Sequence, residues 1–300
     1  MQYTFIEQPE KVYHTGCYNE SAMKDIPPIN ISSLMEKYHL QPDRSLGQNF
    51  LVNPHALERI VDVADITPRD TVLEVGAGLG HLTRYLAAQA AQVVAVEFDE
   101  DLIPPLKEVL DRYPNITVVQ GDILSLAPRD LIHENEYIVV ANIPYYITSS
   151  IIRHLLEAHH KPKHIVLTIQ LEVAKRICAV SGDMSVLALS VQVYGEPYIT
   201  SRIPSTAFHP SPRVDSASVR IDLYPQPLVP KDQMEIFFQL VKAGFQHKRK
   251  TLRNSLSAGM GWPKEKTEHL LEAAGIDARR RAETLALPEW IKLISTHDKM

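Results

Sequence analysis

Between residues 71 and 169, short apolar runs alternate with segments of helical spacing, and this alternation constrains the fold more than any other feature of the chain. Leucines and isoleucines between the runs recur every three or four positions, which predicts amphipathic helices. Apolar strands separated by such helices indicate an α/β fold with a parallel, doubly wound sheet that is buried on both faces. Ligands bind such sheets beyond the carboxyl ends of the strands. The runs with the composition of buried strands are 71–75, 93–96, 116–119, 137–141 and 165–169.

The flanking sequence predicts three parts in this chain of 300 residues. Residues 1–30 show no sustained period, so we expect a loosely ordered N-terminal extension. Residues 31–225 form the main domain, which ends in a strand pair at 198–203 and 216–223. Closely spaced prolines then mark a linker. Helical spacing continues from there to the end, which predicts a small all-helical domain at 226–300.

The charge of the chain is unevenly distributed. The net charge is −5, yet ten basic residues stand against four acidic ones between positions 241 and 281. This segment therefore carries +6, which leaves −11 for the remainder. Such asymmetry is typical of a polyanion-binding face on an acidic protein, although a solvated helical surface is an alternative. The candidate RNA-binding residues are Lys248, Arg249, Lys250 and Arg253.

Other patterns bear on compartment and partners. No apolar run approaches the roughly 18 residues of a membrane span, so we expect no membrane partner. Cys17 and Cys178 cannot make a disulfide framework, and the first residues include Glu7 and Glu10 but no signal pattern. We therefore expect a cytoplasmic protein. The histidines have no metal-site spacing, so we assign no metal, and we expect a monomer.

A glycine-rich loop follows the first predicted strand. Its glycines are Gly76, Gly78 and Gly80, and a dinucleotide site would need a further glycine at position 81, where the chain has His81. This mismatch disfavours a nicotinamide oxidoreductase. The spacing is typical of methyltransferases that use S-adenosylmethionine (SAM), and glycine lets the backbone approach such a cofactor closely. A purely structural turn is the alternative.

Two acids end the next two predicted strands. Glu97 comes 21 residues after Gly76, where a carboxylate can accept both hydroxyls of a ribose. Asp122 ends the third strand, where a carboxylate can accept from an adenine amine. Either acid alone would more often be a helix cap. Both together, in strand order after the glycine loop, favour a cofactor site.

The fourth strand ends in Asn142-Ile143-Pro144-Tyr145, a stretch without a titrating acid or base or a nucleophile suited to hydrolysis. The Asn142 amide oxygen and the Ile143 carbonyl could hold the hydrogens of an adenine N6 amine. They would localise its lone pair and stabilise the positive charge that develops as a methyl group transfers. Tyr145 would stack on the flipped base and Phe208 would cover its other face, although Phe208 could equally be a core anchor.

Five stretches, in this order, resemble the KsgA/RsmA family of rRNA adenine N6,N6-dimethyltransferases, from about Ser45 to the C-terminus. The stretches are 47–51, 74–80, 142–145, 205–216 and 249–254. The resemblance implies a Rossmann-like SAM-dependent methyltransferase. It also implies dimethylation of two adjacent adenosines in the 3′-terminal hairpin loop (helix 45) of 16S rRNA, within the small ribosomal subunit. The cofactor contacts that it implies are Asn49, Leu51, Gly76, Glu97, Asp122 and Asn142.

Some positions depart from the family pattern, and other functions stay open. Leu171 stands where a basic residue is expected, and 182–185 lack the usual Tyr-Gly pair, which puts local rRNA contacts in doubt. One alternative is the 23S rRNA adenine N6-methyltransferase of the macrolide-resistance type, which shares the Asn-Ile-Pro-Tyr type of motif. The stretches 208–216 and 249–254 favour the small-subunit family. A further alternative is a ribosome-assembly factor with dispensable catalysis.

Overall fold

A central sheet organises the computed structural model, of which residues 26–43 and 46–298 are described here. The predicted extension therefore lies outside the described residues, apart from 26–30. Seven described strands form this sheet, in the order β4-β3-β2-β5-β6-β9-β7. β1 and β8 form a separate antiparallel pair. The strands are β1 (Phe50–Leu51), β2 (Thr71–Val75), β3 (Gln92–Glu97), β4 (Ile116–Gln120), β5 (Ile138–Asn142), β6 (His164–Gln170), β7 (Gly195–Ile203), β8 (Phe208–His209) and β9 (Ser216–Leu223).

The five predicted strands are parallel, as expected, whereas the last two are not. β9 runs antiparallel to both β6 and β7 and lies between them. The complete sheet is therefore mixed. β4 also differs from the prediction of a buried strand, because it lies at the edge of the sheet and its residues are half-buried or exposed. The prediction of a final strand pair at 198–203 and 216–223 is confirmed.

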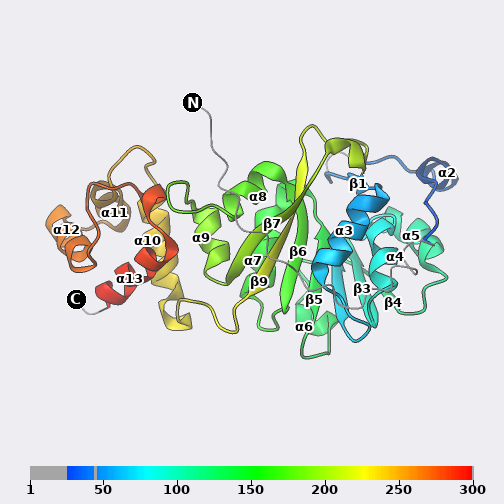
Figure 1. Ribbon diagram of the computed structural model, residues 1–300, viewed down its shortest axis with the longest axis horizontal. Helices are drawn as coiled ribbons and strands as arrows, with labels where there is room; N and C mark the ends of the chain where they lie inside the picture. The colour runs from blue at the N-terminus through cyan, green and yellow to red at the C-terminus, as the bar shows by residue number, and fades with distance from the viewer. Residues whose placement is uncertain (1–25, 44–45, 299–300) are drawn as a thin grey trace.

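Helices cover both faces of the sheet, and a second group lies beyond its β7 end (Figure 1). Asn53 caps α3 by accepting from the Ala56 N–H at 3.0 Å, with Pro54 as the first helical residue. Ser185 caps α9 in the same way, by accepting from the Ala188 N–H at 3.1 Å. The helices are α2 (Ile31–Lys37), α3 (Pro54–Ala64), α4 (His81–Ala87), α5 (Ile103–Leu110), α6 (Pro128–Leu131), α7 (Thr148–Glu157), α8 (Leu171–Ile177), α9 (Val186–Gln192), α10 (Met234–Phe245), α11 (Leu252–Met260), α12 (Lys264–Ala273) and α13 (Leu287–His297).

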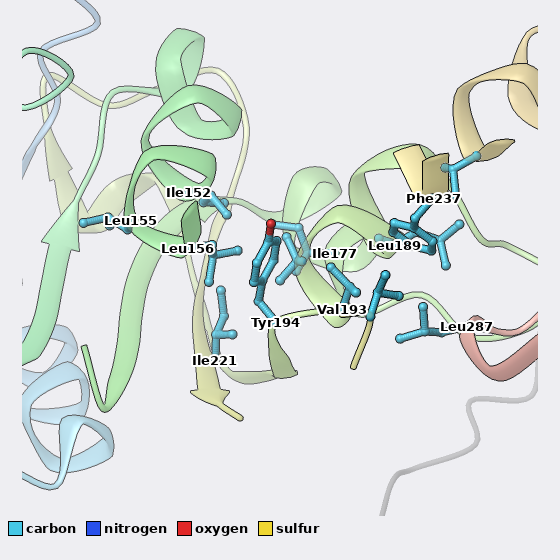
Figure 2. Close-up of a cluster of buried hydrophobic side chains, with 14 of the residues drawn as sticks. Ile152, Leu155, Leu156, Ile177, Leu189, Val193, Tyr194, Ile221, Phe237 and Leu287 are labelled. Carbon is cyan, nitrogen blue, oxygen red and sulfur yellow. The ribbon is translucent and has the colours of Figure 1, made fainter. Parts of the chain in front are cut away.

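The C-terminal helices pack on the main domain through an apolar core. In Figure 2, Val193 and Leu189 lie between Ile177 and Tyr194 on the sheet side and Phe237 of α10 and Leu287 of α13 on the other side. These side chains belong to one continuous buried cluster. Such packing fixes the position of α10–α13 relative to the sheet.

Two kinds of feature are absent from residues 26–43 and 46–298. None of the helices there has both the length and the apolar character that crossing a membrane requires. No group of three His, Cys, Asp or Glu side chains in the same ranges is placed to hold a metal ion.

Candidate functional site

A cavity of about 290 Å³ opens at the carboxyl ends of β2, β3 and β5. Parallel strands bring their carboxyl ends to one edge, so residues that follow different strands meet there. The structure gathers nine of the predicted site residues around this cavity. They are Asn49, Gly76, Gly78, Glu97, Asp122, Asn142, Ile143, Pro144 and Tyr145.

The glycine loop after β2 adopts a backbone that favours glycine. Gly76 and Gly78 have φ of +77° and +57°, in the left-handed region. A Cβ at Gly78 would lie 3.0 Å from the Phe50 ring, whereas the Gly78 N–H donates to Glu97 Oε2 at 2.6 Å. Gly80 packs against α5 instead and does not line the cavity. Gly76 and Gly78 therefore line the cavity, whereas Gly80 packs in the core.

Glu97 is nearly buried, with an exposed fraction of 7%. Burial raises the pKa of its carboxyl, while hydrogen bonds from the backbone N–H groups of Asp99 and Gly78 oppose that shift. Oε1 accepts from Asp99 at 2.9 Å and Oε2 from Gly78. A carboxylate oxygen can accept more than one bond, so this arrangement leaves capacity for two further donors. Asp122, at the next strand end, accepts from the Leu124 N–H at 2.9 Å.

Glu74 lies beneath this loop and is fully buried. Burial raises the pKa of Glu74 to about 8, with a smaller contribution from the neighbouring Glu97 carboxylate. Near neutral pH most of the folded protein therefore holds a proton at Glu74 that the unfolded chain has lost. This proton makes stability depend on pH.

We expect Glu74→Gln to flatten the pH dependence of the free energy of unfolding. Between the unfolded pKa near 4.5 and the folded pKa near 8, the folded state binds the extra proton. The contribution of this proton to the free energy of unfolding is fully present below pH 4.5. It decreases as pH rises, by up to about 1.4 kcal/mol per pH unit. Urea unfolding at several values between pH 5.5 and 8 measures this slope. Equal slopes in variant and parent would contradict the shift, because Glu97 acts in both proteins.

The Asn142 amide has a defined orientation at the end of β5. Its Nδ2 donates to the backbone carbonyl of Asn49 at 3.1 Å. Since a carbonyl can only accept, the nitrogen must face Asn49, and Oδ1 is the end that can accept from a ligand. The predicted acceptor atom is thus set by a contact from the segment before β1.

The aromatic residues after Pro144 form another part of the cavity lining. The Tyr145 hydroxyl lies 2.7 Å from Oγ of the buried Ser216, and burial raises the pKa of this tyrosine. Thr148 Oγ1 donates to the Tyr145 carbonyl at 3.1 Å. Tyr146 is 60% exposed and also lines the cavity. Tyr145 is therefore anchored, whereas Tyr146 presents aromatic surface to solvent.

Two predicted site residues, Leu51 and Phe208, do not line the cavity. Both are nearly buried, and they pair across β1 and β8 within an apolar cluster. Phe208 thus has the position of a core anchor, the alternative that the sequence left open. Its stacking on a base, and contact of Leu51 with a cofactor, stay predictions.

Sequence reasoning missed several residues of the site. Gln48 lines the cavity and donates to Asp99, and Ser216 anchors Tyr145. Phe98 and Leu124 add exposed apolar surface beside the two acids. Ser216 and Gln48 lie within the stretches that resemble the rRNA dimethyltransferase family, and this resemblance was the signal in the sequence that could have pointed to them. Their partners are distant in sequence, so no local pattern pointed to these contacts.

Some basic residues after α10 are exposed in a turn, and others form ion pairs. Lys248, Arg249 and Lys250 are exposed in the turn between α10 and α11. Figure 1 shows the chain between α10 and α11 at the top of the view, the side on which β1 lies, and Phe50 of β1 lines the cavity. Arg253, in contrast, pairs with Glu268 at 3.0 Å. Nearby, three consecutive arginines each have an acidic partner. The pairs are Arg279 with Asp277, Arg280 with Glu289 and Arg281 with Glu283.

Comparison with known proteins identifies the family. A family model described as "Ribosomal RNA adenine dimethylase" matches residues 40–299. The chain belongs to this family. It is similar to Ribosomal RNA small subunit methyltransferase A of Dehalococcoides mccartyi, with 46% identity over 281 residues that cover 90% of this chain and 96% of that protein. The protein of the same name from Alkaliphilus metalliredigens is 41% identical, with coverage of 90% and 96%.

Solved structures of rRNA methyltransferases share the fold. The crystal structure of the 23S rRNA methyltransferase ErmE has a TM-score of 0.69 at 31% identity and covers 83% of this chain and 100% of that chain. A dimethyladenosine transferase from Plasmodium falciparum has a TM-score of 0.73 at 26% identity, with coverage of 83% and 98%. The chain thus has the Rossmann-like methyltransferase fold with a C-terminal helical region. As a ribosomal RNA adenine dimethylase it is an enzyme, and its methyl donor is SAM.

Proposed function

We propose that this enzyme dimethylates N6 of two adjacent adenosines in the 3′-terminal hairpin loop (helix 45) of 16S rRNA. It acts as a monomer on the small ribosomal subunit in the cytoplasm. The observation that carries the proposal is the Asn142 amide, whose nitrogen is fixed by Asn49 so that its oxygen can accept. This oxygen shares a cavity with Glu97 and Asp122, the two carboxylates suited to a nucleoside cofactor.

The residues around the cavity fit SAM. Glu97 would hold the ribose hydroxyls, since both of its oxygens are oriented by backbone N–H groups and keep accepting capacity. Asp122 would accept from the adenine amine, and Gly76 and Gly78 would allow close approach of the backbone. Asn49, which lines the cavity, would complete these contacts from the segment before α3, whereas contact of the cofactor with Leu51, which does not line the cavity, stays a prediction. SAM supplies a methyl group on a positively charged sulfur.

The acceptor half of the cavity would activate the target amine without a general base. The Asn142 amide oxygen and the Ile143 carbonyl would accept the N6 hydrogens, which draws the nitrogen lone pair out of the ring. The same oxygens stabilise the positive charge that develops on N6. Pro144 restricts the backbone between these residues, and Tyr145, anchored by Ser216, would stack on the flipped base.

The substrate RNA would contact the exposed basic turn. Lys248, Arg249 and Lys250 are exposed in the chain between α10 and α11, which lies on the same side of the view as β1 (Figure 1), and they are not paired with acids in the described residues. The Arg253–Glu268 pair is partly exposed, and such pairs contribute little, so a phosphate could replace Glu268. Phosphate contacts position the RNA, whereas the cavity selects the base.

Replacing Lys248, Arg249 and Lys250 together by alanine should weaken binding to small subunits and flatten its salt dependence. Each lost phosphate contact lowers the slope of log K against log salt by about 0.7 to 0.9, so we expect the loss of three contacts to lower it by about 2 to 3. A matched control replaces three exposed cations that precede β2, β4 and β6, at the opposite ends of the strands: Arg69, Arg112 and Lys163. Equal slopes in the two triple variants would exclude the basic turn as the RNA contact.

The choice between ribosomal subunits is directly testable. Purified protein and labelled SAM are incubated with undermethylated small subunits and, separately, with large subunits. We expect label on adenosines of the small-subunit rRNA, in line with the names of the relatives that are 46% and 41% identical. Label confined to the large-subunit rRNA would instead support the 23S rRNA alternative; the 23S rRNA methyltransferase ErmE is 31% identical to this chain.

A further inference from the structure

Gln48 contacts both the start of its own loop and the turn after β3. Its Nε2 donates to Asp99 Oδ2 at 2.6 Å, and its Oε1 accepts from the Asp43 N–H at 2.8 Å. The Gln48 backbone N–H also donates to the Asp43 carbonyl at 3.2 Å. Because both ends of the side-chain amide are used, its orientation is fixed. The segment 47–49 is thereby held against the residues that follow Glu97.

The same segment also contacts the acceptor half of the cavity. The Asn49 carbonyl accepts from Asn142 Nδ2 at 3.1 Å. Gly47, with φ of +64°, packs so closely that a Cβ there would lie 3.3 Å from the Tyr146 ring and 3.5 Å from Pro144. Segment 47–49 therefore touches the predicted acceptor residues at several points.

A continuous series of polar contacts results. The Asp99 N–H donates to Glu97 Oε1 at 2.9 Å, and Asp99 Oδ2 accepts from Gln48. Asn49 follows Gln48 directly and binds Asn142. These contacts connect Glu97, the carboxylate suited to the cofactor ribose, with Asn142, the amide suited to the target amine. In this series, the Gln48 side chain supplies the hydrogen bond that joins the turn after β3 to the segment before β1.

We propose that Gln48 is a positioning residue, which holds Asn142 in the orientation that accepts the target amine by tying segment 47–49 to Asp99. The inference rests on the function proposed above. Without the hydrogen bond between Gln48 and Asp99, the Asn49 carbonyl no longer fixes the Asn142 amide. If this amide rotated by half a turn, its NH₂ group would face the target amine, and both groups are hydrogen-bond donors. Methyl transfer should then slow, while RNA affinity, which depends on stacking and the basic turn, changes little.

A reciprocal substitution tests this role. Gln48→Glu places a carboxylate against Asp99 and should lower kcat for small-subunit methylation about 10-fold, with KM for the subunit nearly unchanged. Asp99→Asn should also slow the reaction. Because Asp99 Oδ1 accepts from the Asp101 N–H, the introduced amide would turn its nitrogen toward the Gln48 nitrogen. In the double variant, the amide at position 99 can donate to the carboxylate at position 48, and kcat should return to within about 3-fold of the parent.

The outcomes separate the two proposals. Recovery of kcat in the double variant supports the contact between positions 48 and 99. If the single substitutions acted only by lowering stability, their effects would add in the double variant and would not cancel. Unchanged kcat in Gln48→Glu, or no recovery, would overturn it. Gln48→Ala, which adds no charge, should lose kcat like Gln48→Glu but gain nothing from Asp99→Asn. A parent protein that fails to methylate small subunits would refute the proposed function itself, whereas an active parent with an unaffected Gln48→Glu variant refutes only the positioning role.

Discussion

Asn142→Ala is expected to lower kcat for methylation of small subunits by about 10²- to 10³-fold, the usual effect of removing one polar group that stabilises developing charge. The amide oxygen is the atom that would accept from N6 and offset the positive charge there. Alanine removes it and also releases the contact with the Asn49 carbonyl. Single-turnover methylation with saturating SAM and undermethylated subunits measures the chemical step directly.

Binding measurements complete this test. Subunit binding should be spared, because stacking by Tyr145 and contacts from the basic turn remain, and SAM affinity should weaken by less than about tenfold. Asn135→Ala is a suitable control, since Asn135 is exposed and precedes β5, at the other end of the same strand. If methyl transfer survived in Asn142→Ala, this account of the acceptor site would be wrong. Lost methylation with intact binding would also separate catalysis from any assembly role.

Glu97→Ala is expected to raise the Kd for SAM by about 10²-fold or more. Two hydrogen bonds from ribose hydroxyls to a carboxylate are each worth about 1.5 to 3 kcal/mol, and every 1.4 kcal/mol is a factor of ten. The substitution also leaves the N–H groups of Gly78 and Asp99 without their acceptor, which loosens the glycine loop. Isothermal titration calorimetry with SAM gives the change in affinity.

A nearby acid serves as the control for this variant. Asp101 is exposed, lies four positions on and does not line the cavity, so Asp101→Ala should leave the Kd for SAM within about twofold of the parent. Urea unfolding of both variants shows whether the loss is confined to binding. SAM affinity that is unchanged in a folded Glu97→Ala protein would remove Glu97 from the cofactor site.

Much of the site could be predicted because its residues follow consecutive strands. Glu97, Asp122 and Asn142 each end an apolar run, and parallel strands place their carboxyl ends at one edge. The glycine loop was readable for a similar reason, since the positive φ angles at Gly76 and Gly78 favour glycine. These predictions thus rested on the types of residue that follow each strand.

The contacts that orient the site could not be predicted in this way. Asn142 and Asn49 are 93 positions apart, Tyr145 and Ser216 are 71 apart, and Gln48 and Asp99 are 51 apart. Such hydrogen bonds depend on how loops from different parts of the chain fold over the sheet. Phe208 illustrates the same limit, because its pairing with Leu51 across β1 and β8 buries it in the core rather than at the cavity.

The sequence by itself therefore determined strands β2–β6, their parallel direction and the residues that follow them, because side-chain periodicity and glycine geometry are local properties. Only the tertiary structure decided that β9 inserts antiparallel between β6 and β7, and that Gln48 and Asn49 set the direction of the Asn142 amide. Strand order and side-chain hydrogen bonds join residues distant in sequence, so they are fixed only when the whole chain packs.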